Sequence, residues 1–337
     1  MDFFEENQAA VPPSFDETIK EITLFVKQHS DRCIALVTSG GTTVPLELKT
    51  VRFIDNFSTG TRGARCCEEL LRGGYAVIFM HRQGSAFPFA TDLCSALREN
   101  PMTLLNGSFE SATINDKKTM GLISSQILTL PFTTIFEYMF LFRETHCALK
   151  IAGSRAMTIL AAAVSDFYIP IPLMANDKIQ SRSTNGLTLE LKNTPKLLGF
   201  IRNEWCPQAT IVSFKLETNP NILAAKAAKS LERYGVDIVC ANILKTRRNL
   251  VTLIRRSLPH GSNETTSIVI KQNGEITGKE ENPIEVDGIL QTSISLPIVE
   301  SGGENLIELP LIQNLIEIHQ MFVKQRQTLP TDDEKKV

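Results

Sequence analysis

The sequence predicts an α/β fold in which a mostly parallel sheet is covered by helices on both faces. Strand-like apolar runs and helical patterns alternate at least four times along the chain, which is typical of such folds. Glycines, hydroxyl residues or acidic residues follow several of these strands, and in a parallel sheet the strand ends meet at one edge. We therefore expect a ligand site there. The strand ends in question follow Val37, Phe53, Val164, Val212 and Cys240.

The first half of the chain alternates helix and strand. A helix is predicted from Ser14 onward, because a capping residue precedes apolar residues at helical spacing. The apolar run 33–42 is a predicted strand that ends in two glycines, and the alternating run 48–57 is predicted to be the second strand. Residues 61–74 read as a helix stopped by paired glycines, and 75–82 as the next strand.

The second half repeats this alternation. Residues 157–170 are predicted to form a buried strand that breaks at Ser165 and Asp166. An Asn-Gly turn signal precedes an alternating run, so we expect a hairpin within 176–194. The other predicted elements are helices over 133–152, 194–205, 219–235 and 309–326 and strands over 210–217, 236–244, 250–256 and 265–271.

The remaining segments indicate how the chain is organised. Residues 1–14 read as a flexible arm and 328–337 as a polar tail, which leaves 15–327 as a single domain. The stretch 84–130 is weakly patterned and rich in Asn, Gly, Ser and Thr. We expect it to be an insertion into that domain.

Composition excludes several classes of protein. The formal net charge of −2 gives no electrostatic reason to expect nucleic acid or a membrane surface as a partner. The acidic N-terminus lacks the pattern of a signal peptide, and the densest apolar run, 128–142, is too short and too polar to span a bilayer. The seven cysteines form no CxxC pair, and the five histidines show no metal-ligand spacing. We expect a cytoplasmic protein, which could also enter the nucleus, without a metal site of its own.

Two glycine- and hydroxyl-rich stretches are candidates for phosphate binding. The first, TSGGT, contains Gly40 and can present backbone N–H groups to a phosphate, or can be a plain tight turn. The second, NFSTGTRG (56–63), leads into a predicted helix, whose N-terminus attracts anions. Arg52 and Arg62 flank it and could pair with a phosphate. The alternative is an ordinary capped helix with solvated arginines.

Other candidates lie at later strand ends and on the hairpin. They are Ala162, Ala163, Asp166, Lys178, Phe214 and Asn242. The alanines allow a close approach of a ligand, or of a packed helix, and the aspartate binds a ligand or caps a turn. A loop lysine supplies charge when the loop closes, or is an ordinary surface residue. The phenylalanine stacks on a base or belongs to the core.

Six motifs in order resemble one family. VTSGGT, VRFIDNFSTGTRG, LAAAVSDFYIP, KIQS, SFKLET and VCANIL, between about residues 33 and 246, are similar to phosphopantothenoylcysteine synthetase, also called phosphopantothenate–cysteine ligase, in its stand-alone eukaryotic form. The resemblance implies a Rossmann-like fold and a homodimer with sites shared between subunits. It also implies a ligase of coenzyme A biosynthesis that joins 4′-phosphopantothenate and L-cysteine through an acyl nucleotidylate. The nucleoside triphosphate would be ATP, with CTP as the alternative, and would carry Mg²⁺.

The resemblance also implies residue roles. Asn56 would contact phosphopantothenate and stabilise the reacting acyl group, and Lys178, on an active-site loop over 176–194, would neutralise phosphate charge. Nucleotide-binding positions would be Gly40, Ser58, Gly60, Gly63, Phe214 and Asn242, and phosphopantothenate-binding positions Asn56, Ala162, Ala163 and Asp166. Phosphate contacts by Arg52 and Arg62 are our own inference from their position.

Two other functions stay open at this point. One is a non-catalytic nucleotide sensor or scaffold of the same fold, which would bind ligands without a requirement for cysteine. The other is a nicotinamide-dependent reductase, which would need a Gly-rich dinucleotide fingerprint followed about twenty residues later by an acidic side chain. TSGGTTVPLE does not supply that spacing.

Overall fold

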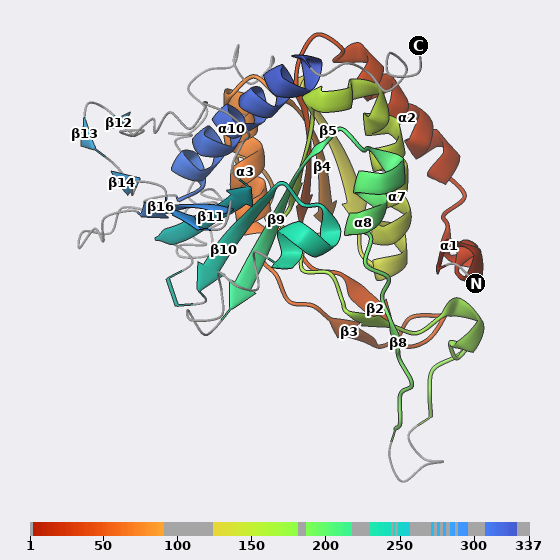
Figure 1. Ribbon diagram of the computed structural model, residues 1–337. Coiled ribbons are helices and arrows are strands. Elements are labelled where there is room, and N and C mark those ends of the chain that lie inside the picture. The colour runs from red at the N-terminus through yellow and green to blue at the C-terminus, as the bar shows by residue number, and fades with distance from the viewer. Residues whose placement is uncertain are drawn as a thin grey trace, which may run out of the picture.

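The structure is a computed structural model that describes residues 3–90, 124–180, 187–217, 229–243 and 307–328, with shorter stretches between 245 and 295. Its centre is a sheet in which ten strands pair within these described residues, with helices on both faces (Figure 1). The predicted α/β fold class is therefore confirmed.

Six neighbouring strands of this sheet are parallel. Their order across the sheet is β5-β4-β1-β6-β9-β10. Numbered along the chain this order is 3-2-1-4-5-6, the arrangement of doubly wound dinucleotide-binding folds. The order reverses between β1 and β6, so the ligand crevice is expected at the carboxyl ends of these two strands. The six strands are β1 (Ile34–Ser39), β4 (Ala76–Arg82), β5 (Ile127–Phe132), β6 (Ala156–Leu160), β9 (Thr210–Glu217) and β10 (Ile238–Ile243).

Antiparallel strands extend the sheet beyond β10. β11 (Leu250–Arg256) pairs with β10, and β16 (Ile289–Ser295) pairs with β11. β14 (Lys279–Glu280) and β15 (Ile284–Val286) both pair with β16, whereas β12 (Lys271–Gln272) and β13 (Glu275–Ile276) pair with each other in a separate two-stranded sheet.

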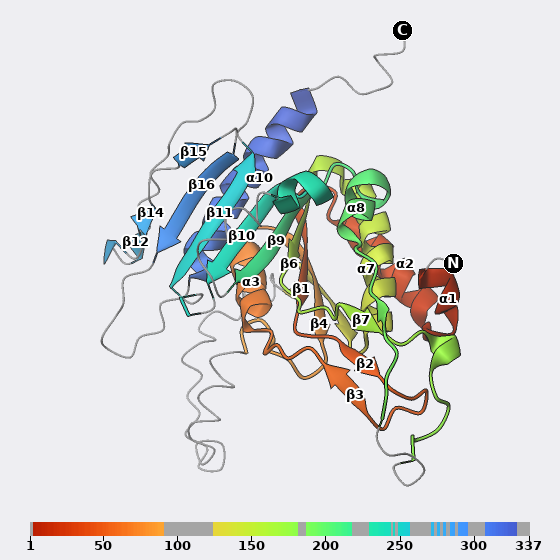
Figure 2. The same ribbon diagram turned by 60° about the horizontal axis from the view of Figure 1, so that its bottom comes forward.

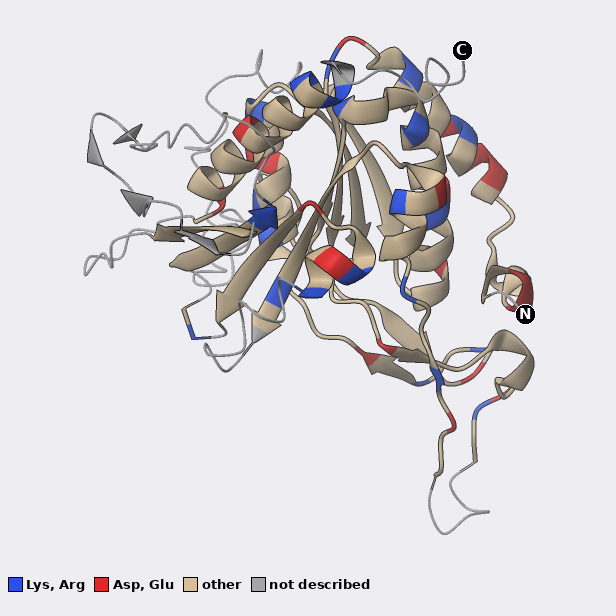
Figure 3. Cartoon of the chain, in the orientation of Figure 1, with Lys and Arg blue, Asp and Glu red and all other residues tan. Residues whose placement is uncertain are grey.

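Two pairs of helices cover the sheet. α3 (Thr61–Arg72) and α10 (Glu308–Thr328) pack on one face, and α2 (Phe15–Gln28) and α7 (Ile135–Leu149) on the other, as Figures 1 and 2 show. The strands send alternate side chains into two separate apolar clusters, one under each helix pair. Charged positions lie mainly on the helices and loops (Figure 3). The sheet is thus buried on both faces, which explains its nearly continuous apolar strands.

A small hairpin lies outside the main sheet. β2 (Thr43–Pro45) pairs with β3 (Phe53–Asp55), and both lie below the strand ends, next to β7 (Phe167–Tyr168) and β8 (Lys192–Asn193) (Figure 2). The strand predicted over 48–57 is confirmed for Phe53–Asp55, but it pairs with β2 outside the main sheet. All three β3 residues are exposed, so no helix covers them. The strand that follows β1 in the main sheet is β4.

The first residues are packed instead of forming a flexible arm. α1 (Phe3–Glu6) buries two phenylalanines, and the 3₁₀ turn η1 (Gln8–Ala10) follows it. The buried Asn7 side chain accepts a hydrogen bond from Ile171 N at 2.9 Å. The paired phenylalanines, which face the α7 aromatics, are the sequence signal for this packing.

Other boundaries also differ from expectation. β5 begins inside the predicted insertion 84–130 and is an edge strand of the sheet. β6 ends at Leu160, well before the predicted break. The remaining short elements are η2 (Lys150–Arg155), η3 (Ile171–Leu173), α8 (Leu198–Phe200) and the π-helical η5 (Ile201–Trp205). Residues 91–123, the hairpin tip 181–186, the strand predicted at 265–270 and the tail beyond 328 lie outside the described residues.

No described helix combines the length and the hydropathy needed to cross a bilayer.

Candidate active site

The turn after β1 lies directly beside the segment after β6. Gly40 adopts φ +82°, a conformation that favours glycine. Ala163 N donates to Gly40 O at 2.8 Å, and Thr42 N donates to Ala163 O at 3.1 Å. These bonds continue the β1–β6 pairing past the strand ends, and they bring Gly40 and Ala163 together at the point where the strand order reverses.

Asn56 reaches this point by a different route. Its backbone N donates to Thr42 O at 3.1 Å. A Cβ placed on Gly41 would lie 1.6 Å from Asn56 O, so the two backbone segments touch only because residue 41 is glycine. The predicted catalytic residue therefore lies beside the β1 turn, although it does not follow a strand of the main sheet.

The N-terminus of α3 completes a compact group of glycines. Gly60, with φ +77°, precedes the helix, and its carbonyl accepts a hydrogen bond from Ser39 Oγ at 2.9 Å. Gly60 N donates to Ser58 Oγ at 3.3 Å. A Cβ on Gly63 would lie 2.4 Å from Ser39 Oγ, so helix and strand are in direct contact. We call Gly40, Gly41, Gly60 and Gly63 the glycine cradle.

The cradle lies next to groups that favour an anion. The first four amides of a helix have no intrahelical acceptor, and α3 carries no acidic residue in its first turn. All four cradle glycines are buried, and the absence of their side chains lets the β1 turn pack directly against the start of α3. The arrangement can therefore present several N–H donors to one phosphate group.

Phe214 lies beside the start of α3. It packs against the apolar cluster under α3 and α10, and the guanidinium carbon of Arg62 lies 5.5 Å from the centre of its ring. Arg62 also forms an ion pair with Glu308 of α10, at 3.3 Å. The Arg62 guanidinium thus links the start of α3 to Phe214 of β9.

Asn242 lies on the neighbouring strand with an unused acceptor. The residue is 4% exposed, and its Oδ1 has no hydrogen-bond partner within the part of the chain that the structure describes. It follows Cys240 by two positions and therefore points to the same face of the sheet as Phe214. A buried acceptor is costly unless a donor reaches it, so this atom marks a place for a ligand N–H group.

The phosphopantothenate-binding candidates divide into two groups. Ala162 and Ala163 lie at the β1–β6 junction, where Ala162 N donates to Thr38 Oγ1 at 3.2 Å. Asp166 lies further along the chain, is exposed, and forms an ion pair with Lys196. The alanines thus border the glycine cradle, whereas the aspartate faces outward.

Arg52 and Ile179, the residue after Lys178, both contact the buried carboxylate of Glu47. Arg52 Nη1 donates to Glu47 Oε1 at 2.8 Å and to Ile179 O at 3.1 Å. Lys178 itself is exposed. A phosphate contact by Arg52 stays a prediction, but the guanidinium would have to share it with Glu47. The same holds for Arg62 and Glu308.

Comparisons with known proteins identify the family. Residues 145–269 match the family model described as the DNA/pantothenate metabolism flavoprotein C-terminal domain. Phosphopantothenate–cysteine ligase 2 of Oryza sativa subsp. japonica is 37% identical over 320 residues, which cover 89% of this chain and 92% of that protein. The chain belongs to the phosphopantothenate–cysteine ligase family.

Two further matches support this membership. The Homo sapiens phosphopantothenate–cysteine ligase is 41% identical over 241 residues, covering 67% of this chain and 76% of that protein. A solved structure of a Cab2 mutant in complex with phosphopantothenate-cysteine has a TM-score of 0.74 and 31% identity, and the match covers 97% of this chain and 99% of that one. Both the resemblance indicated by the six motifs and the Rossmann-like fold are confirmed.

Sequence reasoning missed several polar residues of this ligase-family site. Ser39 and Thr38 end the apolar strand β1 and hold Gly60 and Ala162. Glu47 is fully buried in an otherwise apolar stretch. The signal in each case is a polar side chain inside an apolar run, which requires a partner when it is buried.

The described residues offer neither a nucleophilic thiol nor a metal cluster at this site. Burial raises the pKa of Cys240 to about 12, so this thiol stays protonated at neutral pH. No group of three or more His, Cys, Asp or Glu side chains in the described residues is placed to hold a metal ion.

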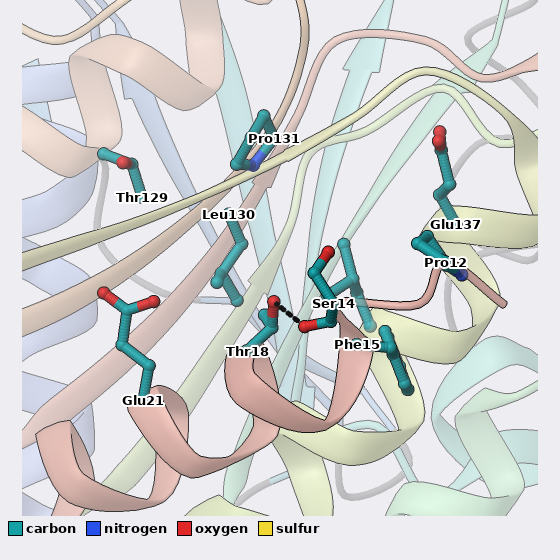
Figure 4. A pocket seen from close by; sticks show the side chains of 10 residues that line it. Pro12, Ser14, Phe15, Thr18, Glu21, Thr129, Leu130, Pro131 and Glu137 are labelled. Carbon is teal, nitrogen blue, oxygen red and sulfur yellow. Dashed lines mark hydrogen bonds between the residues drawn. The ribbon is translucent and has the colours of Figure 1, made fainter.

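A separate cavity of about 240 Å³ lies between the start of α2, β5 and α7 (Figure 4). Ser14, Thr18 and Glu137 contribute polar groups, and Thr18 Oγ1 donates to Ser14 O at 3.3 Å. None of the predicted site residues lines it. The cavity is at the edge strand of the sheet and is not part of the ligase site.

Proposed function

We propose that this chain joins 4′-phosphopantothenate to L-cysteine by an amide bond in coenzyme A biosynthesis, the reaction for which its relatives are named. One observation carries the proposal. Gly40, Asn56 and Ala163, which come from three distant parts of the sequence, meet where the strand order reverses. A nucleotide-binding surface and a carboxylic-acid site can share this position.

The reaction would proceed in two steps. A carboxylate oxygen of phosphopantothenate attacks the α-phosphorus of the nucleotide, and the bond to pyrophosphate breaks. The cysteine amine then attacks the activated carbonyl carbon, the C–O bond to the nucleoside monophosphate breaks, and the amine loses a proton. Both steps develop negative charge on oxygen, so fixed N–H donors stabilise them better than a nucleophilic side chain would.

The glycine cradle would bind the triphosphate. Gly40, Gly60 and Gly63 let the β1 turn and the start of α3 pack closely together, and Ser58 adds a hydroxyl next to the first α3 amides. Mg²⁺ would enter with the triphosphate as part of the substrate. The helix N-terminus favours the anion through its unpaired N–H groups and its dipole.

Phe214 and Asn242 would bind the base. The Phe214 ring offers a stacking surface whose other contacts include Arg62. Asn242 Oδ1, which has no partner among the described residues, can accept a hydrogen bond from an exocyclic amino group, which adenine and cytosine carry and uracil lacks. We propose ATP as the substrate and CTP as its competitor.

Asn56, with Ala162, Ala163 and Asp166, would bind phosphopantothenate. The Asn56 amide can donate to the acyl oxygen without adding a charge that repels the carboxylate. Lys178, on the neighbouring loop, would approach the phosphates as the developing charge grows. Asp166 and Lys178 are both exposed, which fits a site completed by a second subunit.

A homodimer would cover an exposed apolar patch around β3. Phe57 is 83% exposed, and other large apolar side chains are exposed nearby along the chain. Patches of this kind mark protein interfaces. The other patch residues are Leu48, Val51, Phe53, Ile54, Phe167 and Leu173. Light scattering should report a dimer, and Phe57→Asp should shift it toward monomer; a monomeric wild type would contradict this part of the proposal.

One assay tests the activity. The purified protein is incubated with 4′-phosphopantothenate, L-cysteine and ATP, CTP or UTP, while pyrophosphate release and product mass are followed. We expect product with ATP, less with CTP and none with UTP. A sensor or scaffold would bind nucleotide without cysteine-dependent turnover, and that outcome would overturn the proposal. Fluorescence microscopy of the tagged protein would test the proposed cytoplasmic or nuclear location.

A further inference from the structure

Glu47 is a fully buried carboxylate in the connection between β2 and β3. Its Oε1 accepts hydrogen bonds from Arg52 Nη1 at 2.8 Å and Ile179 N at 3.3 Å. Its Oε2 accepts from Arg52 N at 3.0 Å and Val51 N at 3.3 Å. Four donors from two separate segments thus converge on one side chain.

These two segments carry the two predicted catalytic residues. The first runs from Glu47 through Arg52 and β3 to Asn56. The second, residues 175–180, contains Lys178. Arg52 Nη1 also donates to Ile179 O at 3.1 Å, and Leu48 N donates to Ala175 O at 2.8 Å. Glu47 lies at the centre of the junction between them.

Other contacts also hold this junction. Lys49 N donates to Asn176 O at 3.3 Å, and Ile179 packs against the core cluster that contains Leu46. β3 and Lys178 are exposed, however, so core packing does not reach the residues next to Asn56 or the lysine itself. The contacts to the buried carboxylate fix these parts most strongly, because hydrogen bonds to a charged acceptor are stronger than neutral ones.

Glu47 stays ionised at this place. Burial alone would raise its pKa, but hydrogen bonds from the amides of Arg52, Ile179 and Val51 and from the Arg52 guanidinium outweigh that effect and lower the pKa below its usual value. The negative charge is thus kept where it can hold both segments.

We propose that Glu47 is a positioning residue that, with Arg52, sets the placement of Lys178 relative to Asn56. This inference rests on the proposed ligase function. A shift of about 1 Å in a catalytic group can lower turnover by roughly 100-fold. The expected effect is therefore on kcat, with a smaller effect on the KM for the nucleotide.

The test variant is Glu47→Gln, which keeps the shape of the side chain but replaces an acceptor oxygen with an NH₂ donor. We expect kcat to fall by up to about 10-fold, the loss expected when the Lys178 side chain itself is removed. The double variant Glu47→Gln with Lys178→Ala should be no slower than Lys178→Ala alone. Once the lysine side chain is absent, its placement by Glu47 can no longer affect kcat. If the kcat losses of the two single variants instead multiply in the double variant, Glu47 acts independently of Lys178. That outcome would show a merely structural role and overturn the proposal.

Lys49→Ala is the matched control. Lys49 and Asp177 form an ion pair between the same two segments, at 2.8 Å, but both side chains are about 70% exposed. Exposed pairs contribute little, so kcat should change less than about 2-fold. An equal loss in Lys49→Ala and Glu47→Gln would contradict a special role for the buried carboxylate.

Hydrogen exchange supplies a readout without activity. In Glu47→Gln the amides of Val51 and Ile179 should exchange faster, while the β1 amides stay protected. Unchanged exchange at both amides would overturn the positioning role, even if ligase activity is present. If wild type lacks ligase activity, the proposed function fails separately. If Glu47→Gln does not fold, Arg52→Gln replaces it as the test variant. It leaves the three backbone donors to Glu47 in place, so we expect a smaller loss of kcat and a smaller increase in exchange at the same amides.

Discussion

The glycine cradle and the outer hairpin (residues 43–55) are both next to Asn56, but different forces hold them. The cradle is bound to the core: Gly63 touches Ser39 of a fully buried strand, and Gly41 touches the Asn56 backbone. The outer hairpin has exposed apolar side chains and one buried carboxylate. The candidate site thus combines the glycine cradle, which packs against the core, with the outer hairpin, which polar contacts hold. Substitutions in the two regions should therefore have different effects on activity and stability.

Removing the Asn56 side chain should have the largest effect on turnover. Asn56→Ala is expected to lower turnover by roughly 10²–10³, the scale for losing one oxyanion donor. The backbone bond from Asn56 N to Thr42 O remains, so the melting temperature should stay close to wild type. A pyrophosphate-release assay checks the rate, and wild-type turnover would remove Asn56 from the chemistry.

A pair of glycines tests the cradle itself. Gly40 and Gly84 both have positive φ, at +82° and +77°, so alanine at either should cost about 1–2 kcal/mol of stability. Only at Gly40 would the new Cβ meet a neighbour, Arg82 Cβ at 2.7 Å, whereas Gly84 has open space. We expect Gly40→Ala to raise the KM for ATP about 10-fold and Gly84→Ala to leave it unchanged. Equal KM values would show that the cradle does not bind nucleotide.

Substitution of Lys178 should lower activity without changing stability. Lys178→Ala is expected to lower kcat about 10-fold, because the variant loses a charge near the phosphates, while unfolding by urea stays unchanged for this exposed side chain. A matching Lys192→Ala, which removes an exposed partner of Glu6, should leave kcat unchanged. A sharp fall in stability for Lys178→Ala would make the lysine structural and weaken the contrast between the two regions.

The stability of the fold should decrease in mild acid, because a buried core histidine resists protonation. Burial lowers the pKa of His146 to about 4, whereas an unfolded histidine titrates near 6.5. Between these values the unfolded state binds the extra proton, so stability falls as the pH is lowered from about 6.5 toward 4. Urea unfolding at several pH values should show this loss, and His146→Gln should reduce it by about half, because burial also lowers the pKa of His319 to about 4. An unchanged slope in the variant would assign the acid sensitivity to other groups.

Much of the fold was predictable because local patterns determine it. Paired glycines after residue 72, the β-branched run before Gly40 and the strong helical pattern near 135–149 all lie where the structure has those elements. Predictions failed where partners came from distant sequence. The N-terminal phenylalanines pack on α7, and β5 is an edge strand although its surroundings look like an insertion.

The candidate site also has parts that local sequence patterns predicted and parts that they could not predict. Glycine-rich turns and the order of the six motifs identified the family, because small residues at strand ends have few structural purposes besides close approach. Arg52 shows the limit of this reasoning. Its position beside the motif suggested a phosphate contact, but its guanidinium lies on Glu47, a partner whose burial no local pattern reveals.

The amino-acid sequence by itself determined the alternation of strands and helices, the class of sheet and the identity of the family, because periodicity and turn chemistry act over a few residues. Only the tertiary structure decided which strand lies beside β1, that Asn56 arrives from a hairpin outside the sheet, and that one buried carboxylate joins the segments of Asn56 and Lys178. Such contacts join residues well separated in the chain, Glu47 and Ile179 by 132 positions, and their free energy depends on burial that exists only after the chain has folded.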